Sequence, residues 1–544
     1  MKKYSPAAIF AALMFIFACM AGNYSRSENE THLPEMADAT KDAGLENIGG
    51  TFFAWGDYNN DGWQDLLVDG HLLFENQLGM NKPIKFWFEN VTNDRGLETA
   101  SGNAVWGDYN NDGWLDLATC SGQLWKNEKG RFTEVSKDAE FKMNKNICSI
   151  AWGDYDNDGY PDLYAAPSEG DGNFHQLFHN KGNGKFEDVS AKYGIDKIAL
   201  YGRSVIWCDY DNDGRQDIYI GNYRLKPNML WHNNKDNAFT NVAEIAGTAG
   251  DNDPQRYKDT AISEAQGKDA KFGPQYGHTI GCAWADFNND GFFDIWVSNL
   301  VHKYVGPTQN SYDIRGYVCD DSKIYINQGG PDFKFMDIRD KSGVARLPIG
   351  GRGVYAGDEL WCNAVCADFD NDTFVDVCVT QIYNLDYAKT KIFRNKGNLT
   401  FEDVAPELGI QFIDTYGAAW ADFNRDGYMD IIVGGRDKVD APQVAHLLKN
   451  EGNNMNWIEF QLEGTASNRA GIGAKIELKA GGKKQVRQVE GGTGSHAQQN
   501  SLTVHFGLGN LEKVDEVTVY WPGGQAQKLG PQTINQIVKA KEKK

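Results

Sequence analysis

The sequence predicts an all-β protein, a seven-bladed β-propeller followed by a small β-sandwich domain. Three observations support this: a composition rich in glycine and aromatic residues, an acidic loop motif that occurs seven times, and a change near Trp457 to longer alternating strands. At 544 residues the chain exceeds a single ordinary core, so at least two domains are expected.

Residues 1–19 are expected to form a signal peptide and residues 20–32 a linker. Lys2 and Lys3 precede an apolar run from Ala7 to Ala18 that is short for a membrane span. Residues 16–19 resemble the lipobox of bacterial lipoproteins, in which Cys19 would carry the lipid; ordinary cleavage near Ala21 is the alternative. We therefore expect an exported protein, either secreted or lipid-anchored at the outer surface or in the periplasm.

The repeated motif places oxygen-bearing side chains at positions 1, 3, 5 and 9 of a tight loop. The candidate ligands are Asp57, Asn59, Asp61 and Asp65 in loop one, Asp108, Asn110, Asp112 and Asp116 in loop two, and Asp154, Asp156, Asp158 and Asp162 in loop three. They continue with Asp209, Asp211, Asp213 and Asp217 in loop four, and Asp286, Asn288, Asp290 and Asp294 in loop five. Loop six holds Asp368, Asp370, Asp372 and Asp376, and loop seven holds Asp422, Asn424, Asp426 and Asp430.

Alternating oxygen ligands can converge on a hard cation, which predicts up to seven Ca²⁺ sites. An EF-hand would also need Glu at position 12, where these loops carry strand-forming residues such as Val68. One copy of the motif would be an ordinary turn sequence, whereas seven copies with Asp always at position 9 favour metal loops. The sixth loop has Thr373 where the others have Gly, and a β-branched residue resists positive φ, so we expect loop six to bind Ca²⁺ most weakly or to be distorted.

The ligand positions of the seven loops hold 24 aspartates, and the net charge of the whole chain is −21. The acidity of the protein therefore comes mostly from the predicted metal loops. A chain this acidic is not expected to bind nucleic acid.

The phase of the repeat sets the domain boundaries. After each of loops one to six come an apolar strand, a segment ending in Asn and a Phe-x-x-Val strand (Phe-x-x-Ile at Phe335 after loop five). With the strand before the loop, these make a four-stranded blade. The Phe-x-x-Val strand is missing after loop seven, and residues 33–45 are expected to replace it. The propeller is thus predicted to span residues 33–452. These repeats resemble the FG-GAP/VCBS family of integrin α-subunit heads, and the resemblance implies a propeller with calcium loops.

Residues 455–540 are predicted to form the β-sandwich. Residues 467–474, 504–509 and 519–523 resemble the ASPIC/UnbV domain, which follows such propellers in cartilage acidic protein and bacterial secreted relatives. The Gly-rich segment Gly491–His496 has no helix after it, so it is expected to be a surface turn rather than an anion cradle.

No CxxC pair occurs, so a zinc or dithiol site is not expected. Cys366 and Cys378 flank one loop and could pair across a hairpin, and Cys319 and Cys362 could tie two long insertions together.

Those insertions, residues 249–280, 301–321 and 345–362, are expected on the face opposite the metal loops and suggest a ligand site there. The candidate ligand-binding residues are Arg203, Tyr257, Tyr276, His278, Tyr304, Tyr355 and Asn363.

Three functions compete. We favour a binding or adhesion module for an extracellular glycan or protein, with Ca²⁺ as a structural element and any membrane contact made through the lipid on Cys19. The alternatives are a carbohydrate-active lyase or dehydratase, with Arg203 and His278 as a possible catalytic pair, and a structural envelope component. No HExxH or G-x-S-x-G motif is present, which favours binding over catalysis.

Overall fold

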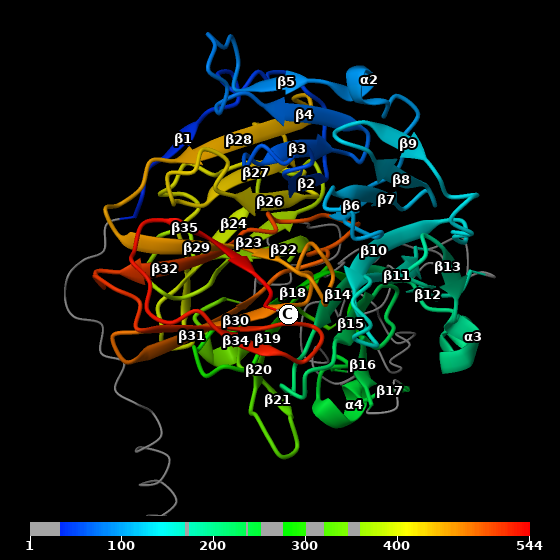
Figure 1. Ribbon diagram of the computed structural model, residues 1–544. Helices are drawn as coiled ribbons and strands as arrows, with labels where there is room; N and C mark the ends of the chain where they lie inside the picture. Colours follow the sequence, from blue (N-terminus) through cyan, green and yellow to red (C-terminus); the bar gives the residue numbers. More distant parts are fainter. Residues whose placement is uncertain are drawn as a thin grey trace, which may run out of the picture.

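The computed structural model describes residues 33–168, 173–234, 238–251, 276–300, 320–345 and 359–543. Within these ranges the chain is almost entirely strand and turn (Figure 1). The helical segments are single turns: α2 (Thr92–Arg95), α3 (Ser190–Tyr193), α4 (Ala243–Ala246), η1 (Ile195–Lys197) and η4 (Arg339–Lys341). The expected signal peptide with Cys19, and the candidates Tyr257, Tyr304, Tyr355 and Cys319, lie outside the described residues.

Seven four-stranded antiparallel sheets form the propeller, as the sequence predicts. Blade one consists of β2 (Phe53–Gly56), β3 (Asp65–Val68), β4 (Leu72–Asn76) and β5 (Phe88–Asn90). Blade two consists of β6 (Ala104–Gly107), β7 (Asp116–Thr119), β8 (Leu124–Asn127) and β9 (Phe132–Glu134). Blade three consists of β10 (Ile147–Gly153), β11 (Asp162–Pro167), β12 (Gln176–Asn180) and β13 (Phe186–Asp188). Blades four and five are β14 (Gly202–Cys208), β15 (Asp217–Asn222), β16 (Met229–Asn233), β17 (Phe239–Asn241); and β18 (Thr279–Ala285), β19 (Asp294–Asn299), β20 (Lys323–Asn327), β21 (Phe335–Asp337). Blade six is β22 (Trp361–Ala367), β23 (Asp376–Gln381), β24 (Lys391–Asn395), β25 (Phe401–Asp403).

Blade seven combines both ends of the propeller sequence. It contains β26 (Ala418–Ala421), β27 (Asp430–Gly435) and β28 (Val444–Asn450), and its outer strand is β1 (Met36–Asp38). Met36 pairs with Asn450 and Asp38 with Leu448 in antiparallel register. The N-terminal segment thereby covers the edge of β28 that would otherwise be free to pair with another chain.

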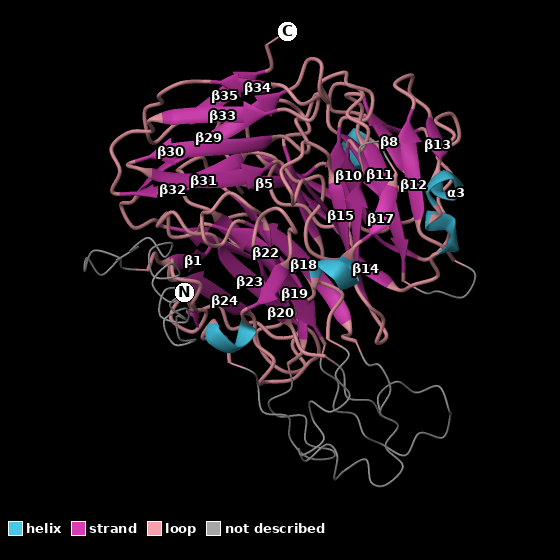
Figure 2. Ribbon diagram, turned by 90° about the horizontal axis from the view of Figure 1, so that it is seen from below, coloured by secondary structure: helices cyan, strands magenta, loops and turns pink. Residues whose placement is uncertain are grey.

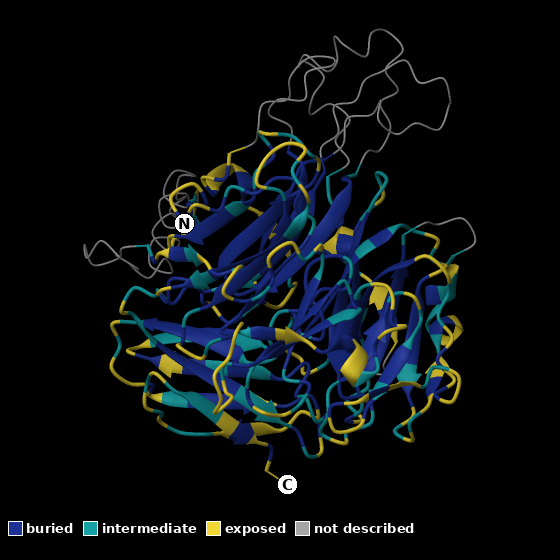
Figure 3. Ribbon diagram, turned by 90° about the horizontal axis from the view of Figure 1, so that it is seen from above, coloured by how far each residue is buried: buried dark blue, intermediate teal, exposed yellow. Residues whose placement is uncertain are grey.

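Tryptophans at the ends of the innermost strands hold adjacent blades together. The indole N–H of Trp207 in blade four donates to the carbonyl of Ala151 in blade three at 3.0 Å. A Cβ on Gly153 would lie 2.4 Å from the Trp207 ring, so only glycine allows this approach. Most strand residues are buried by this packing, and the exposed residues gather in the turns (Figure 3).

The C-terminal domain is a two-sheet sandwich, and Figure 2 shows it as a separate layer on one side of the ring. One sheet has the order β32 (Val504–Gly509), β29 (Asn456–Glu463), β35 (Ile537–Lys541), and the other β31 (Lys483–Gln488), β30 (Lys475–Ala480), β33 (Glu516–Tyr520), β34 (Ala526–Lys528). β35 pairs in parallel with β29. The sequence predicts that the sandwich extends to residue 540 but does not reveal β35 as a separate strand, because its lysines alternate with only a short apolar face.

The Gly-rich segment is not a surface turn, which corrects the expectation for Gly491–His496. Residues 490–501 enter the central channel, where Ser495, Gln498 and Gln499 are fully buried. The N–H of Trp152 in blade three donates to the Gly491 carbonyl at 2.9 Å, and the N–H of Trp106 in blade two donates to Gln499 Oε1 at 2.6 Å. Glycines without side chains fit a loop that must pass between inner strands. We call residues 490–501 the channel loop.

The channel loop touches most of the ring. It accepts from Trp55 of blade one through the Gln499 carbonyl (3.1 Å) and from Trp420 of blade seven through Asn500 Oδ1 (3.0 Å). In blade six, Asn363 Oδ1 accepts the N–H of Ser495 at 2.8 Å. The C-terminal domain is therefore anchored along the propeller axis.

Cysteine pairing does not follow the expectation. The described cysteines are all free thiols. Cys366 pairs in register with Val377, and Cys378 with Val365, so the two sulfurs point to opposite faces of the sheet and cannot be joined. Cys362 is a buried free thiol.

Candidate metal centres

Each acidic loop is shaped by the carboxylate at its first position. In loop one, Asp57 Oδ1 accepts the N–H of Asp61 (3.0 Å) and Asp57 Oδ2 accepts the N–H of Gly62 (2.9 Å). Asn59 Oδ1 also accepts the Asp61 N–H at 2.9 Å, which draws position 3 inward. The same two bonds from position 1 recur in all seven loops. Oxygens from positions 1, 3 and 5 therefore face a common centre.

Position 9 is fixed by an asparagine that ends the third strand of the same blade. In blade four, Asp217 Oδ1 accepts the N–H of Asn233 at 2.7 Å. The Asn233 amide donates to the Gln216 carbonyl of its own loop (3.2 Å) and to the Tyr155 carbonyl of loop three (2.7 Å). This arrangement repeats around the ring, with Asn76, Asn127, Asn180, Asn327, Asn395 and Asn450 as the other six. These asparagines are visible as a repeat in the sequence, but the fold is needed to show that they join adjacent acidic loops.

Position 4 forms a second link between adjacent loops, which was not predicted from the sequence. Asn60 adopts a left-handed conformation (φ 59°), and its amide donates to the carbonyl of Gly113 in the next loop at 2.7 Å. Five further asparagines do the same in loops two to six: Asn111, Asn157, Asn212, Asn289 and Asn371. Asparagine is among the few residues that adopt this conformation readily, and its recurrence at position 4 was a visible signal. Loop seven has Arg425 there, which lies over the Trp63 ring.

Loop six keeps the common backbone. Thr373 has φ 89°, and the glycines at the same position have φ between 83° (Gly427) and 95° (Gly291). The expected distortion is therefore absent from this dihedral. A buried β-branched residue is instead held in a region that it disfavours. Weaker binding by loop six remains a prediction.

Burial makes these carboxylates resist ionisation unless a cation is near. Burial raises the pKa of Asp57 to about 6, with repulsion from Asp61 as the second cause, and raises that of Asp108 to about 7. The position-9 aspartates Asp65, Asp116, Asp294 and Asp430 are shifted well above their ordinary pKa, also mainly by burial. Asp65 Oδ2 is buried and accepts no hydrogen bond. A cation in the loop would supply the partner that this oxygen lacks.

Three loops bring three carboxylates within ligating distance of one another. These are Asp154, Asp156 and Asp162; Asp209, Asp211 and Asp217; and Asp368, Asp370 and Asp376. Buried acidic clusters of this kind can hold a metal ion, and their oxygen-only donor set suits a hard cation.

In blades three, four and six, the residue before the asparagine that holds position 9 also faces the loop, which was not predicted from the sequence. His179 Nδ1 lies 3.3 Å from Asp162 Oδ1, and His232 Nδ1 lies 3.3 Å from Asp217 Oδ1. In loop six the corresponding Arg394 forms ion pairs with Asp370 and Asp372. Loop six thus contains a guanidinium group beside two of its candidate ligands.

The C-terminal domain covers the loop side of the ring with cationic side chains. Lys475 Nζ lies 3.4 Å from Asp209 Oδ2, and Lys484 Nζ donates to the Asp290 carbonyl at 2.9 Å. Buried Arg487 lowers the pKa values of Asp286 and Asp368 against the larger effect of burial. Opposite charges across this contact favour docking of the two domains.

The described ligand-binding candidates Arg203, Tyr276, His278 and Asn363 lie toward the end of the channel that is opposite the acidic loops. The Arg203 carbonyl accepts the N–H of His496 (3.2 Å), and its guanidinium lies 5.1 Å from the centre of the Tyr223 ring. His278 packs on the same ring, with centroids 4.8 Å apart. His278 and Asn363 are fully buried, whereas Arg203 and Tyr276 are partly exposed. Tyr276 donates its hydroxyl to Glu244 at 2.6 Å, away from the others.

Comparison with known proteins agrees with this architecture. Residues 464–544 match the family model for ASPIC and UnbV, and residues 108–165, 162–220 and 368–433 match that for the FG-GAP-like repeat. Cartilage acidic protein 1 of Homo sapiens is 25% identical over 347 residues, which cover 62% of this chain and 43% of the relative. The Xenopus tropicalis protein is 23% identical over 438 residues, which cover 76% of this chain and 58% of the relative. The matches thus leave about half of these relatives' length uncovered.

Solved structures with a similar course of the chain include an Agrocybe aegerita lectin that recognises non-reducing terminal N-acetylglucosamine. It is 16% identical, with a TM-score of 0.39, over 75% of this chain and 91% of the lectin. BBS1N, solved in complex with ARL6DN, is 7% identical, with a TM-score of 0.41, over 78% of this chain and 99% of BBS1N.

Across the residues that the structure describes, no helix has the length and apolar character to cross a membrane. The propeller contains FG-GAP-like repeats, an ASPIC and UnbV domain follows it, and the chain is homologous to cartilage acidic protein 1 at modest identity.

Proposed function

We propose that this protein is an exported binding module for a glycan or protein ligand, in which up to seven Ca²⁺ ions stiffen the propeller. The observation that carries the metal assignment is the repeated inward placement of oxygens at positions 1, 3 and 5, with Asp at position 9 held by the third-strand asparagine. Ca²⁺ takes six to eight such oxygens and tolerates the Asp/Asn variation at position 3.

The position of the loops favours a structural role for the ions. The C-terminal domain contacts the loops directly: the N–H of Arg469 donates to Asn111 Oδ1 at 2.7 Å, and the N–H of Gly509 to the Asn371 carbonyl at 2.7 Å. Ions held there would neutralise buried carboxylates at the domain contact and so stabilise both domains together.

The binding role is supported by how the channel is used. The channel loop fills the axis where a propeller enzyme would admit a substrate, and fully buried His278 is poorly placed to transfer a proton to one. A polar groove remains open between the domains, as described below. Concave sites at domain boundaries are common ligand sites.

A glycan array and a turnover screen, each with and without a chelator, test this proposal. Retention of a ligand without product formation is the expected result. Product formation from any glycan would instead establish the lyase or dehydratase alternative. Failure to retain any glycan or protein probe would leave the structural envelope component as the better account.

A further inference from the structure

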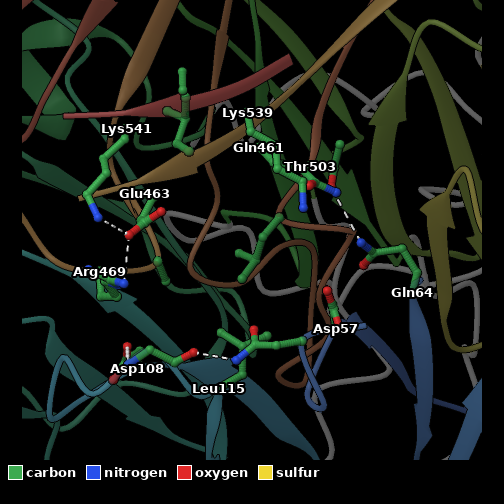
Figure 4. A pocket seen from close by; sticks show the side chains of 16 residues that line it. Asp57, Gln64, Asp108, Leu115, Gln461, Glu463, Arg469, Thr503, Lys539 and Lys541 are labelled. Carbon is green, nitrogen blue, oxygen red and sulfur yellow. Dashed lines mark hydrogen bonds and ion pairs between the residues drawn. The ribbon is translucent and has the colours of Figure 1, made fainter. Parts of the chain in front are cut away.

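A groove of about 380 Å³ opens between the propeller and the C-terminal domain, beside loops one and two (Figure 4). The propeller contributes Asp57, Gln64 and Asp108, and the C-terminal domain contributes residues of β29 and β35. Its volume lies at the small end of the range for ligand sites in proteins. It is separate from the channel mouth where the sequence placed the ligand candidates.

Two amide side chains and a hydroxyl form the inner part of the groove. Gln64 is only 7% exposed, and its Oε1 is buried without a hydrogen-bond partner. Gln64 Nε2 and Gln461 Nε2 each lie 3.4 Å from Thr503 Oγ1. Buried amide oxygens are rarely left unpaired, so the Gln64 carbonyl is suited to a donor brought by a ligand. Together these groups offer both donors and acceptors, as the recognition of sugar hydroxyls requires.

The outer wall is cationic. Arg469 and Lys541 both pair with Glu463, at 2.6 Å and 2.7 Å, so this group keeps one net positive charge. Lys539 is exposed on β35 and forms no ion pair within the described part of the chain. Figure 4 shows Lys541 directed toward Glu463 at one end of the groove, and Lys539 beside Gln461 on the side opposite Asp57 and Asp108. A carboxylate could therefore pair with Lys539 without breaking an existing ion pair.

The opposite wall is formed by two candidate metal ligands, Asp57 and Asp108. When loops one and two hold a divalent cation, these carboxylates are neutralised and no longer repel an anion. The groove would then combine a cationic rim with uncharged hydrogen-bonding groups.

We propose that this groove binds the acid-bearing end of a uronate-containing oligosaccharide, with Lys539 pairing with the carboxylate and Gln64, Gln461 and Thr503 bonding to ring hydroxyls. This inference rests on the proposed binding function and names a ligand class and a site for it. An acidic peptide side chain would use the cationic wall but leave the amide pair unmatched, so the saccharide fits the whole groove better.

Isothermal titration calorimetry of the full Ca²⁺-loaded protein with digalacturonate and with the corresponding neutral disaccharide tests the site. The uronate is expected to bind more tightly than the neutral sugar, with an affinity that falls as salt is added. Lys539→Gln and Gln64→Leu should each weaken uronate binding by tenfold or more. Lys513→Gln is the matched control, because Lys513 is a largely exposed lysine whose partner is Asp515 and which does not line the groove.

Thermal melting of each variant separates loss of the site from loss of the fold. Unchanged melting with weakened uronate binding supports the proposal. Equal affinity for the two sugars, or unchanged uronate binding in both groove variants, overturns it. If other glycans are still retained in that case, the binding function stands and only this groove is rejected; if no glycan or protein probe binds at all, the proposed function fails as well.

Discussion

At the scale of single residues, position 6 of each loop shows how the backbone conformation restricts which residue can occupy a position. Six of the seven loops have glycine with φ near 90°, and loop six holds Thr373 in the same conformation. The motif made this constraint visible in the sequence, because glycine recurs where the chain must turn sharply. What the sequence could not show was that threonine would adopt the turn rather than distort it, since that depends on the surrounding loop bonds.

Gly214→Thr tests the cost of this conformation. Apart from its two chain neighbours, no atom of the described residues lies within 4 Å of a Cβ added at Gly214, so the change isolates backbone strain. The free energy of unfolding is expected to fall by about 1–2 kcal/mol, measured by denaturant unfolding in Ca²⁺. Gly214→Asn should cost less, because asparagine tolerates positive φ better. Equal stability of Gly214→Thr and the unmodified protein would contradict the strain argument.

Arg394 gives a second reason for loop six to differ. Its guanidinium pairs with Asp370 and Asp372, so a cation entering the loop must compete with it. Arg394→Gln is expected to tighten Ca²⁺ binding at the weakest site several-fold, measured by calorimetric titration of metal-stripped protein. Lys396→Gln, also in blade six, is the matched control, because Lys396 pairs with the exposed Glu402 rather than with a loop carboxylate. No change in the weakest site of Arg394→Gln would show that Arg394 does not compete.

At the scale of elements, the order of loops and strands was predictable because the same local sequence motif recurs in each blade. The position-4 and third-strand asparagines were visible as repeats, but their partners lie in neighbouring blades and required the fold. β35 was not recognised, because Lys539 and Lys541 alternate with apolar residues only briefly. Pairings between distant segments, such as that of β35 with β29, leave little local signal.

The raised pKa values of the loop carboxylates predict that the stability of the metal-free protein depends on pH. The pKa values of Asp57 and Asp108 are raised to about 6 and about 7, so the metal-free folded state binds protons more tightly than the unfolded chain. The contribution of these two carboxylates to its stability should be fully present below about pH 4 and be lost as the pH rises to about 7. Ca²⁺ replaces those protons, so stabilisation by Ca²⁺ should grow over the same interval.

Melting temperatures of metal-stripped and Ca²⁺-loaded protein at pH 5 and pH 7.5 would measure this effect. The stripped protein is expected to melt at a lower temperature at the higher pH, and the gap between the two forms to widen. A stripped protein that is more stable at pH 7.5 would show that the loop carboxylates are not the dominant titrating groups.

The strand β1 supplies the second prediction at this scale. Deleting residues 33–45 removes the partner of β28 and exposes the edge of blade seven. The melting transition should fall in temperature and become less cooperative. An undiminished transition would mean that β1 does not close the ring in solution. Deletion of the two C-terminal residues Lys543 and Lys544, which lie beyond β35, is the control.

At the scale of the whole molecule, the two domains form one structure. A single apolar core includes Trp152 and Phe186 of the propeller together with Ile472 and Val504 of the C-terminal domain. The channel loop extends this contact along the axis of the ring. Sequence patterns predicted both domains but not the contact between them. A glycine-rich segment has the same sequence pattern whether it forms a surface turn or enters a channel.

Metal content and melting of the intact protein test the central claim most directly. Purified protein should retain Ca²⁺, measured by elemental analysis after dialysis, with one ion for each loop and the weakest retention at loop six. Removing the ions with a chelator should lower the melting temperature sharply, and adding Ca²⁺ back should restore it. Protein that holds no Ca²⁺ in millimolar calcium, or whose melting is unaffected by the chelator, would contradict the account.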